Sequence, residues 1–221
     1  MSEHEFSLNT ATVIADPSGA LWWPAERLLV VADLHLEKAS AYAVGGILLP
    51  PYDSQATLAR LSAVIARRQP LHIMALGDSF HDGDAAARLD AAVGERLRIM
   101  VADCPRWTWL TGNHDPAPPL GFGGEVHSEV RLGPLAFRHE PLPRMVGEVA
   151  GHLHPKIRIA TRARRISARC FITDGLRVVL PAFGALTGGL DIRDAAIRGL
   201  FPTKPVALAL GPQRVHAVAV R

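Results

Sequence analysis

Residues 28–35 read LLVVADLH, an apolar run that is followed at once by Asp33 and His35. A run of this length, made of aliphatic and β-branched residues, predicts a buried strand. Further runs follow it in alternation, with strands predicted over 72–76 and 106–110 and helices over 54–68 and 84–101. Strands that alternate with helices favour right-handed crossovers and parallel pairing. The first half of the chain therefore predicts a parallel sheet covered by helices.

The second half of the chain has a different pattern. From Val126 onward, short β-rich runs are divided by turn signals at 132–134, 174–175 and 211–213. Hairpins that follow a parallel sheet suggest two sheets packed face to face with helices outside. With 221 residues, of which 48% are hydrophobic, the chain is long enough to bury such a core. We therefore predict an α/β fold, a two-sheet β-sandwich flanked by helices, formed by a single domain over residues 1–221.

Two local features carry smaller predictions. Asp53 or Ser54 stands at the start of the first predicted helix and is its expected N-cap. Trp22 and Trp23 are adjacent, so only one of them is expected to face inward. Both tryptophans of the run 106–110 are expected to pack in the core rather than to stack on nucleic-acid bases.

Composition points to a protein of the cytoplasm. The formal net charge is +3, from 24 basic and 21 acidic residues, a mild excess that suits a phosphate-bearing partner without requiring one. The two cysteines, Cys104 and Cys170, have neither disulfide-framework nor metal-finger spacing, which favours a reducing compartment. The first residues lack the pattern of a signal peptide, and no run approaches the ~18 apolar residues that cross a bilayer. We expect a soluble cytoplasmic protein with no membrane partner.

The same event recurs at five predicted strand ends: an apolar run stops and ligand-type residues follow. They are Asp33 and His35 in LLVVADLH, Asp78 in IMALGD, Asn113, His114 and Asp115 in WTWLTGNHD, His139 in LAFRHE, and His152 and His154 in GEVAGHLH. Strand ends are where α/β sheets place ligands, because the sheet fixes the backbone while the following loop aims the side chains. Five convergent loops could build one site.

These residue types suit a pair of divalent metal ions. Oxygen and imidazole ligands without thiolate favour Mn²⁺, Fe or Zn²⁺, and the carbonyl oxygen of Asn113 is a reasonable neutral ligand. A mononuclear site would need only about three or four of the residues. Two Asp, one Asn and four His are available, with His114 left over. We therefore expect two ions that share a bridging Asp.

The ordered motifs D-x-H, G-D, G-N-H-D, a lone H and G-H-x-H resemble those of the calcineurin-like metallophosphoesterases, and they span residues 33–154. The resemblance implies a four-layer αββα form of the sandwich and hydrolysis of a phosphoester. It implies that one metal is held by Asp33, His35, Asp78 and His154, with Asp78 bridging, and that the second is completed by Asn113, His139 and His152. It also implies that His114 lies beside the phosphate and assists the leaving oxygen, with Asp115 orienting it.

A narrower resemblance, to bacterial metallophosphoesterases associated with a DNA ligase and a helicase, rests on LGDSFHD (76–82), GHLHPK (151–156) and LPAFGALTGG (180–189). Members of that group are regarded as manganese-dependent DNA endonucleases in repair. The resemblance implies DNA as the substrate and Mn²⁺ as the first choice of metal, with Fe or Zn²⁺ as alternatives. A short chain without a capping domain favours an open site and long polymers, and we expect a preference for single-stranded DNA.

Residues outside the ligand set are candidates for holding the substrate. His81 and Asp82 follow Asp78 closely enough to face the site, although an acid near a helix start is as often a cap. The stretch 156–169 holds six cations and no acid, namely Lys156, Arg158, Arg162, Arg164, Arg165 and Arg169. It is the best candidate for contact with a nucleic-acid backbone, Lys156 and Arg158 first, but a solvated pair of antiparallel strands would look similar.

The chemistry leads to a binuclear phosphodiesterase in which a metal-activated hydroxide attacks the diester and His114 assists the leaving group. One alternative keeps the same metals: a phosphomonoesterase, or a phosphodiesterase of small molecules or cyclic nucleotides. Another alternative is a catalytically silent scaffold that binds partner proteins. Scaffolds of this kind typically have an eroded ligand set, whereas the set here is intact.

Overall fold

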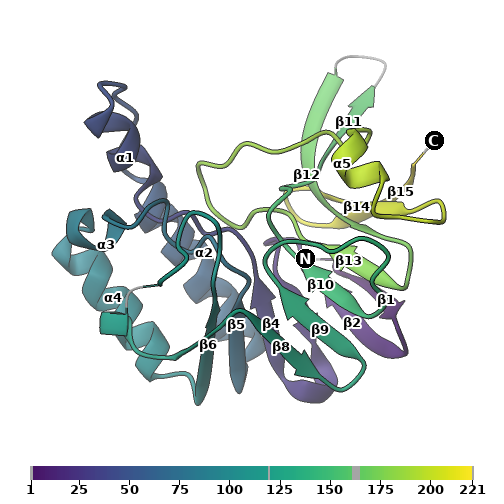
Figure 1. The fold of residues 1–221 in the computed structure, drawn as a ribbon, viewed down its shortest axis with the longest axis horizontal. Helices are drawn as coiled ribbons and strands as arrows, with labels where there is room; N and C mark the ends of the chain where they lie inside the picture. Colours follow the sequence, from purple (N-terminus) through teal and green to yellow (C-terminus); the bar gives the residue numbers. More distant parts are fainter. Residues whose placement is uncertain (1, 119, 161–164, 221) are drawn as a thin grey trace.

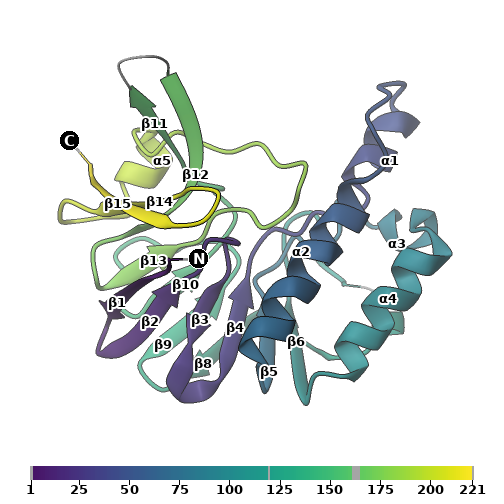
Figure 2. The ribbon, with the colours of Figure 1, turned by 180° about the vertical axis from the view of Figure 1, so that it is seen from behind.

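Two β-sheets pack face to face in the computed structural model, which describes residues 2–118, 120–160 and 165–220 (Figure 1, Figure 2). Within those residues the first sheet has seven strands, in the order β1 (His4–Leu8), β2 (Ala11–Ala15), β3 (Leu21–Trp23), β4 (Leu28–Val31), β5 (His72–Ala75), β6 (Arg106–Leu110) and β7 (Glu125–His127). The second has eight: β15 (Val215–Ala219), β14 (Val206–Leu210), β12 (Arg165–Thr173), β13 (Arg177–Val179), β10 (Glu148–Ala150), β9 (Leu135–Arg138) and β8 (Glu129–Leu132), with β11 (Lys156–Ala160) paired to β12.

The α-helices of the described residues are α1 (Lys38–Val44), α2 (Asp53–Arg68), α3 (Ala85–Arg88), α4 (Ala91–Ala102) and α5 (Ala195–Arg198). Two single-turn 3-10 helices span Pro24–Glu26 and Leu120–Phe122. Helices α2 and α4 cover the outer face of the first sheet, whereas α1 projects beyond its edge (Figure 1). None of the helices in the described ranges is both long and apolar enough to cross a bilayer.

The strand β4 shows why this sequence makes a sandwich. Leu28 and Val30 belong to the core between the two sheets, whereas Leu29 and Val31 pack on the helix side, and all four are fully buried. Because alternate side chains leave opposite faces of a strand, a strand covered on both faces needs an uninterrupted apolar run. As predicted, β4, β5 and β6 pair in parallel.

Both tryptophans of β3 are buried, so the prediction that only one faces inward is wrong. Trp22 packs on the helix side of the first sheet and Trp23 packs between the sheets. The two side chains do leave opposite faces, but both faces are covered. Trp107 and Trp109 of β6 lie in the helix-side core, as expected.

The outer face of the second sheet is covered thinly. Ile172 of β12 and two alanines of β14, Ala207 and Ala209, pack there with Ile197 of α5 and with Phe201. The α/β two-sheet fold is confirmed, and its fourth layer consists of the single turn α5 and neighbouring loop residues such as Phe201.

The helix predicted over 84–101 is interrupted. It forms α3 and α4, because Leu89 adopts an extended backbone and Asp90 begins a new helix. The carboxylate of Asp90 accepts hydrogen bonds from the N–H groups of Ala92 and Val93, which satisfies donors at the start of α4.

The N-cap predicted for α2 is wrong. Asp53 and Ser54 lie at its start, but neither side chain caps it. Asp53 instead accepts a hydrogen bond from the N–H of Ala39 at 3.1 Å, and the Ser54 hydroxyl accepts one from the N–H of Glu37 at 2.8 Å. Both side chains therefore hold the beginning of α1, a helix that the sequence analysis does not predict.

Candidate metal centre

The loops that follow five strands meet at one edge of the sandwich. Asp33 and His35 follow β4, Asp78 follows β5, Asn113 follows β6, His139 follows β9, and His152 and His154 follow β10. Strands β4, β5 and β6 belong to the first sheet, whereas β9 and β10 are parallel neighbours in the second. Residues from both sheets, far apart in the chain, are thus brought together.

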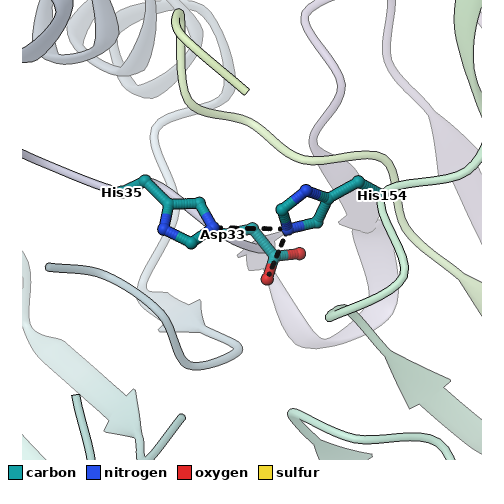
Figure 3. A group of neighbouring side chains, drawn as sticks. All are labelled: Asp33, His35 and His154. Carbon is teal, nitrogen blue, oxygen red and sulfur yellow. Dashed lines mark hydrogen bonds and ion pairs between the residues drawn. The ribbon is translucent and has the colours of Figure 1, made fainter. Parts of the chain in front are cut away.

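Asp33, His35 and His154 form the first cluster, whose side chains point toward one another (Figure 3). Their ligand-type atoms all lie within 4.8 Å of one another. The Nε2 atom of His154 is 3.2 Å from Oδ1 of Asp33 and 3.3 Å from Nε2 of His35. One carboxylate and two imidazoles therefore converge on one point.

Asp78, His139 and His152 form the second cluster, again with ligand-type atoms within 4.8 Å of one another. The Nε2 atom of His139 is 3.3 Å from Oδ2 of Asp78 and 3.1 Å from Nδ1 of His152. Oδ1 of Asn113 lies 3.0 Å from the same nitrogen of His139. The Asp78 carboxylate is also 3.9 Å from Nε2 of His35, so it stands between the two clusters, where a bridging ligand would be needed.

The donor set fits a pair of divalent cations. Asp33 and Asp78 are buried, and among the described residues neither carboxylate forms an ion pair with a lysine or an arginine. A buried carboxylate without a cation is costly. In each cluster two imidazole nitrogens face one another, at 3.3 Å and 3.1 Å, and a cation between them would use both lone pairs.

Backbone strain marks the same residues. Asp33, His35, Asp78, His152 and His154 have positive φ angles, between 43° and 68°. A left-handed backbone costs energy for residues other than glycine, and it tends to collect at functional sites. Five of the seven predicted ligands therefore have a backbone held in an unfavourable conformation.

Two glycines leave room for the ligands. A Cβ on Gly77 would lie 2.6 Å from Cγ of His139, and a Cβ on Gly151 would lie 2.7 Å from Oδ2 of Asp33. Gly77 also has a φ of +72°. Each glycine directly precedes a predicted ligand, so a side chain at either position would displace the cluster.

Burial and nearby charges set the protonation of the clusters. Burial opposes protonation of His139, but the carboxylates of Asp78 and Asp33 outweigh it and raise its pKa to about 9. Burial and the neighbouring His154 lower the pKa of His35 to about 2. His35 is therefore neutral, the form that binds a metal, whereas His139 holds a proton that a bound cation would displace.

His114 lies beside the clusters in a fixed orientation. Its Nδ1 is 2.9 Å from the backbone carbonyl oxygen of His81, to which it can donate a hydrogen bond. The imidazole rings of His114 and His81 stack with their centroids 5.0 Å apart. The backbone N–H of His114 donates to Oδ1 of Asp78 at 2.9 Å. With Nδ1 engaged, Nε2 is the ring nitrogen available to a substrate.

The His81 carbonyl, rather than Asp115, orients the His114 ring, which corrects the role predicted for Asp115. The buried carboxylate of Asp115 accepts hydrogen bonds from the N–H groups of Ser79, at 2.8 Å, and Phe80, at 3.1 Å. Burial raises the pKa of Asp115 to about 6. Asp115 thus holds the loop that carries His81.

An open pocket of about 620 Å³ leads to both clusters, and His81, predicted to lie near the substrate, lines it. Residues that the sequence pattern did not reveal also line it: Lys38, Ala41 and Tyr42 of α1, Gly45 directly after its end, and Ile47 beyond. The first four have the spacing of one helix face. That spacing is the only sequence signal for them, and it becomes visible once α1 is known to be a helix.

The basic stretch after β10 has partners within the protein. Lys156 donates to the carbonyl oxygen of Thr187 at 3.2 Å, Arg158 pairs with Asp191 at 3.4 Å, and Arg169 donates to the carbonyl oxygen of Ala182 at 2.8 Å. Arg158 keeps 69% of its side chain exposed. Burial, with a smaller contribution from the positive charge of Lys156, lowers the pKa of Lys38, although the carboxylates of Asp78 and Asp53 oppose this. Arg162 and Arg164 lie outside the described residues.

Comparison with known proteins agrees with this geometry. Residues 26–167 match the family model described as calcineurin-like phosphoesterase. The crystal structure of Pseudomonas putida nuclease MPE is similar, with a TM-score of 0.76 and 28% sequence identity, covering 98% of this chain and 100% of that one. A search of curated proteins found no match.

Proposed function

This chain belongs to the calcineurin-like phosphoesterase family, and from that premise we propose that it is a two-metal DNA endonuclease that favours single-stranded DNA. Family membership and the nuclease neighbour make it a metal-dependent phosphoester hydrolase. The observation that carries the proposal is the convergence of two ligand clusters at the base of one open pocket.

Seven residues would hold the metals in this proposal: Asp33, His35, Asp78, Asn113, His139, His152 and His154. When bound, the ions supply Lewis acidity that activates water and offsets charge on the phosphate. Oxygen and imidazole donors suit Mn²⁺ first, with Fe or Zn²⁺ as alternatives. The protein fixes where these donors stand, through the strained loops that end β4, β5 and β10.

His114 assists the leaving oxygen in this proposal. The alkoxide that leaves a DNA strand is a poor leaving group, so a proton donor at that oxygen speeds cleavage. The His81 carbonyl holds Nδ1 of His114, which leaves Nε2 to carry the proton. His81, Lys156 and Arg158 are proposed to contact the substrate, and Lys38 adds positive charge at the pocket.

DNA as the substrate is supported by the nuclease neighbour and by the open pocket. The pocket is lined by α1 on one side and by the loop leading to β11 on the other, and both α1 and the β11–β12 hairpin project from the same edge of the sandwich (Figure 2). In this proposal a flexible single strand enters the open pocket more easily than a stiff duplex.

A cellular setting forms part of the proposal. A role in DNA repair, beside a DNA ligase and a helicase, rests on the resemblance of three short motifs alone. A cytoplasmic location suits two cysteines, Cys104 and Cys170, that are both free thiols. Co-purification of the chain with a ligase or helicase from its own cells would test the association.

The test of the function uses covalently closed circular DNA, because a circle has no ends for an exonuclease. Purified protein is incubated with single-stranded and with duplex circles in Mn²⁺, beside an Asp78→Asn variant. We expect the single-stranded circles to be cut faster and the variant to be inactive. Intact circles with every metal tried, or equal cutting by Asp78→Asn, would refute the proposal.

The same preparation addresses the alternatives. Turnover of a nitrophenyl monoester or of a cyclic nucleotide, with circles left intact, would assign a small-molecule phosphoesterase. Failure to bind Mn²⁺ together with no turnover of any ester would assign a protein-binding scaffold.

A further inference from the structure

The helix α1 presents one face to the metal centre. Lys38, Ala41 and Tyr42 line the pocket from α1, as does Gly45 directly after its last residue, and their spacing places them on a single stripe. The stripe begins with a cation, continues with an aromatic ring and has small residues around the ring. Val44 lies off the stripe and is 78% exposed. The side of α1 that faces the site therefore differs in chemistry from its solvent side.

Tyr42 is the outer member of a row of stacked rings. Its ring stacks on His81 with centroids 6.1 Å apart and an interplanar angle of 24°. The His81 ring stacks in turn on His114, at 5.0 Å and 20°. The row leads from the surface of α1 to the residue proposed to assist the leaving oxygen. Tyr42 remains 39% exposed, so part of its ring is free.

The base of α1 is fixed to the rest of the protein. Asp53 and Ser54 bind the backbone at its beginning. Arg88 donates to the hydroxyl of Ser40 at 3.0 Å and pairs with Asp82, which lies next to His81, at 2.7 Å. Tyr42 is thus presented by a helix that is held in place, which lowers the cost of ordering it when a ligand binds.

The neighbours of Tyr42 favour a nucleobase as its ligand. Any base offers a flat π-face that stacks on an aromatic ring, and the phosphate of the nucleotide that carries it has the charge that Lys38 complements. Ile47, which lines the same pocket, adds an apolar surface near the ring. A peptide or lipid ligand would use the apolar surface. It would not explain why an aromatic ring, Tyr42, and a cation, Lys38, line the same pocket beside a phosphoesterase site.

We propose that Tyr42 extends the row of rings by stacking on a base of the bound strand close to the cleaved phosphodiester, while Lys38 contacts a phosphate of the same strand. This inference rests on the proposed nuclease function and adds a determinant of its substrate class. Binding is then tolerant of sequence but requires an unpaired base, because a paired base is already stacked within its duplex. Tyr42 acts as a binding residue and does not touch the reacting atoms.

The first test combines a variant with a modified substrate. In a single-stranded oligonucleotide, bases are removed one at a time to leave abasic sites, and cleavage by wild-type protein and by Tyr42→Leu is measured in Mn²⁺. We expect Tyr42→Leu to raise KM for intact DNA by about five- to a hundred-fold, with kcat changed much less. One abasic position should slow the wild type by a similar factor and should not slow Tyr42→Leu further.

Control variants separate stacking from folding. Tyr42→Trp keeps a ring and should retain the wild-type KM. Tyr52→Leu removes an aromatic ring that is 66% exposed and lies outside this pocket, and it should leave KM unchanged. A KM for Tyr42→Leu equal to that of the wild type, or an equal loss in Tyr42→Trp, would overturn the proposal.

The second test does not depend on cleavage. Oligonucleotides with a single 2-aminopurine are bound to Asp78→Asn protein in Mn²⁺, and fluorescence is read at each position of the probe. We expect stacking to quench one position, and the added Tyr42→Leu change to abolish that quench. Quenching that is unaffected by Tyr42→Leu counts against the inference alone, whereas the lack of any DNA cleavage by the wild-type protein counts against the proposed function.

Discussion

Five residues with a left-handed backbone surround the candidate site, and each turns a side chain toward it at the expense of backbone strain. The neighbouring His114 has a favourable backbone partner instead, since its N–H donates to Asp78. Its ring is held by a carbonyl group, which carries no net charge. Among the described residues His114 forms no ion pair, which suits the role of acid proposed for it.

The role proposed for His114 predicts a difference between substrates. His114→Ala should lower kcat/KM for DNA by about 10²–10⁴-fold, because the alkoxide leaving group needs a proton. A nitrophenyl diester, whose leaving group is stable without one, should lose much less. Steady-state rates on both substrates check this, and equal losses would contradict the assignment. Asp115→Asn should act differently, by loosening the loop that its carboxylate holds.

A second residue-scale prediction concerns pH and lies far from the site. Asp16 is buried, and burial opposes its ionisation. A hydrogen bond from the N–H of Ser18 and further ones from Arg67 and Arg68 outweigh that effect and lower its pKa below the ordinary 3.8. The stabilisation is therefore complete above about pH 4 and is lost as the pH falls through the lowered value.

Asp16→Asn tests that pH dependence. At pH 7 the variant should lose about 1.5–3 kcal/mol of unfolding free energy, the range for hydrogen bonds to charged groups. The difference in unfolding free energy between the two proteins should narrow as the pH falls from about 4 through the lowered pKa, below which the wild-type carboxyl is neutral. Urea unfolding at several pH values provides the measurement. Glu5→Gln, at an exposed carboxylate on β1, should show little change at any pH.

Sequence alone predicted which residues gather at the site, because each follows an apolar strand and strand ends meet at one edge. Their left-handed backbones and the partner of His114 could not be predicted in this way. Both depend on loops from other parts of the chain, and the carboxylate next to His114 in sequence, Asp115, turns toward Ser79 instead.

At the scale of elements, the strand-to-loop junctions hold the candidate metal ligands. Gly77 lies two residues after the end of β5. Its lack of a side chain leaves room for His139, which directly follows β9 of the second sheet. Gly77→Ala should cost about 1–3 kcal/mol of unfolding free energy, since alanine must adopt a positive φ, and it should also reduce metal binding by displacing His139. Urea unfolding and metal analysis of the purified variant would show both effects.

Gly83→Ala is the matched control for that change. Gly83 lies in the loop that follows β5, its φ is not positive, and nothing lies within 4 Å of a Cβ placed there. Its unfolding free energy and metal content should stay near those of the wild type. Unchanged metal content in Gly77→Ala would mean that the cluster tolerates a shift of His139.

The elements themselves were predictable to different degrees. Strands β4, β5 and β6 are predicted by apolar runs, and the ends of these runs can be recognised from the sequence alone. Helix α1 has only seven residues, too few to show a helical period, and its beginning is stabilised by Asp53 and Ser54 from the next helix. The break between α3 and α4 depends on Asp90, which looks like an ordinary surface acid in the sequence.

At the scale of the molecule, one buried ion pair ties the second sheet to its loops. Arg177 of β13 contacts Glu148 of β10 at 3.0 Å and donates to three backbone carbonyl groups, those of Leu142, Met145 and Leu200. Both charged side chains are almost fully buried. Removing the arginine leaves a buried carboxylate without its closest cation.

Arg177→Met should therefore lower the unfolding free energy by about 3–5 kcal/mol. Denaturant unfolding of the wild type and the variant at neutral pH measures this loss of unfolding free energy. Adding Glu148→Gln to the same protein should recover part of the loss, because the uncompensated charge is gone. Arg193→Met, which removes an exposed partner of Asp191, should change stability little. A loss in Arg177→Met no larger than in Arg193→Met would show that the pair adds nothing.

The two-sheet architecture could be predicted because its strands alternate with helices first and with turns later. The thin cover on the second sheet could not, since loop residues such as Phe201 provide it and loops have no period. That residues 1–221 form one domain stays a prediction, consistent with the shared core between the sheets.

The order of the candidate ligands along the chain has a consequence for biosynthesis. Asp33, Asp78 and Asn113 leave the ribosome well before the imidazoles of His139, His152 and His154, which belong to a sheet whose later strands are still to be made. A half-translated copy therefore holds Asp33, His35, Asp78 and Asn113 but lacks three of the four imidazole ligands. For the proposed nuclease, neither cluster can be completed until the second half of the chain has been synthesised and has packed against the first.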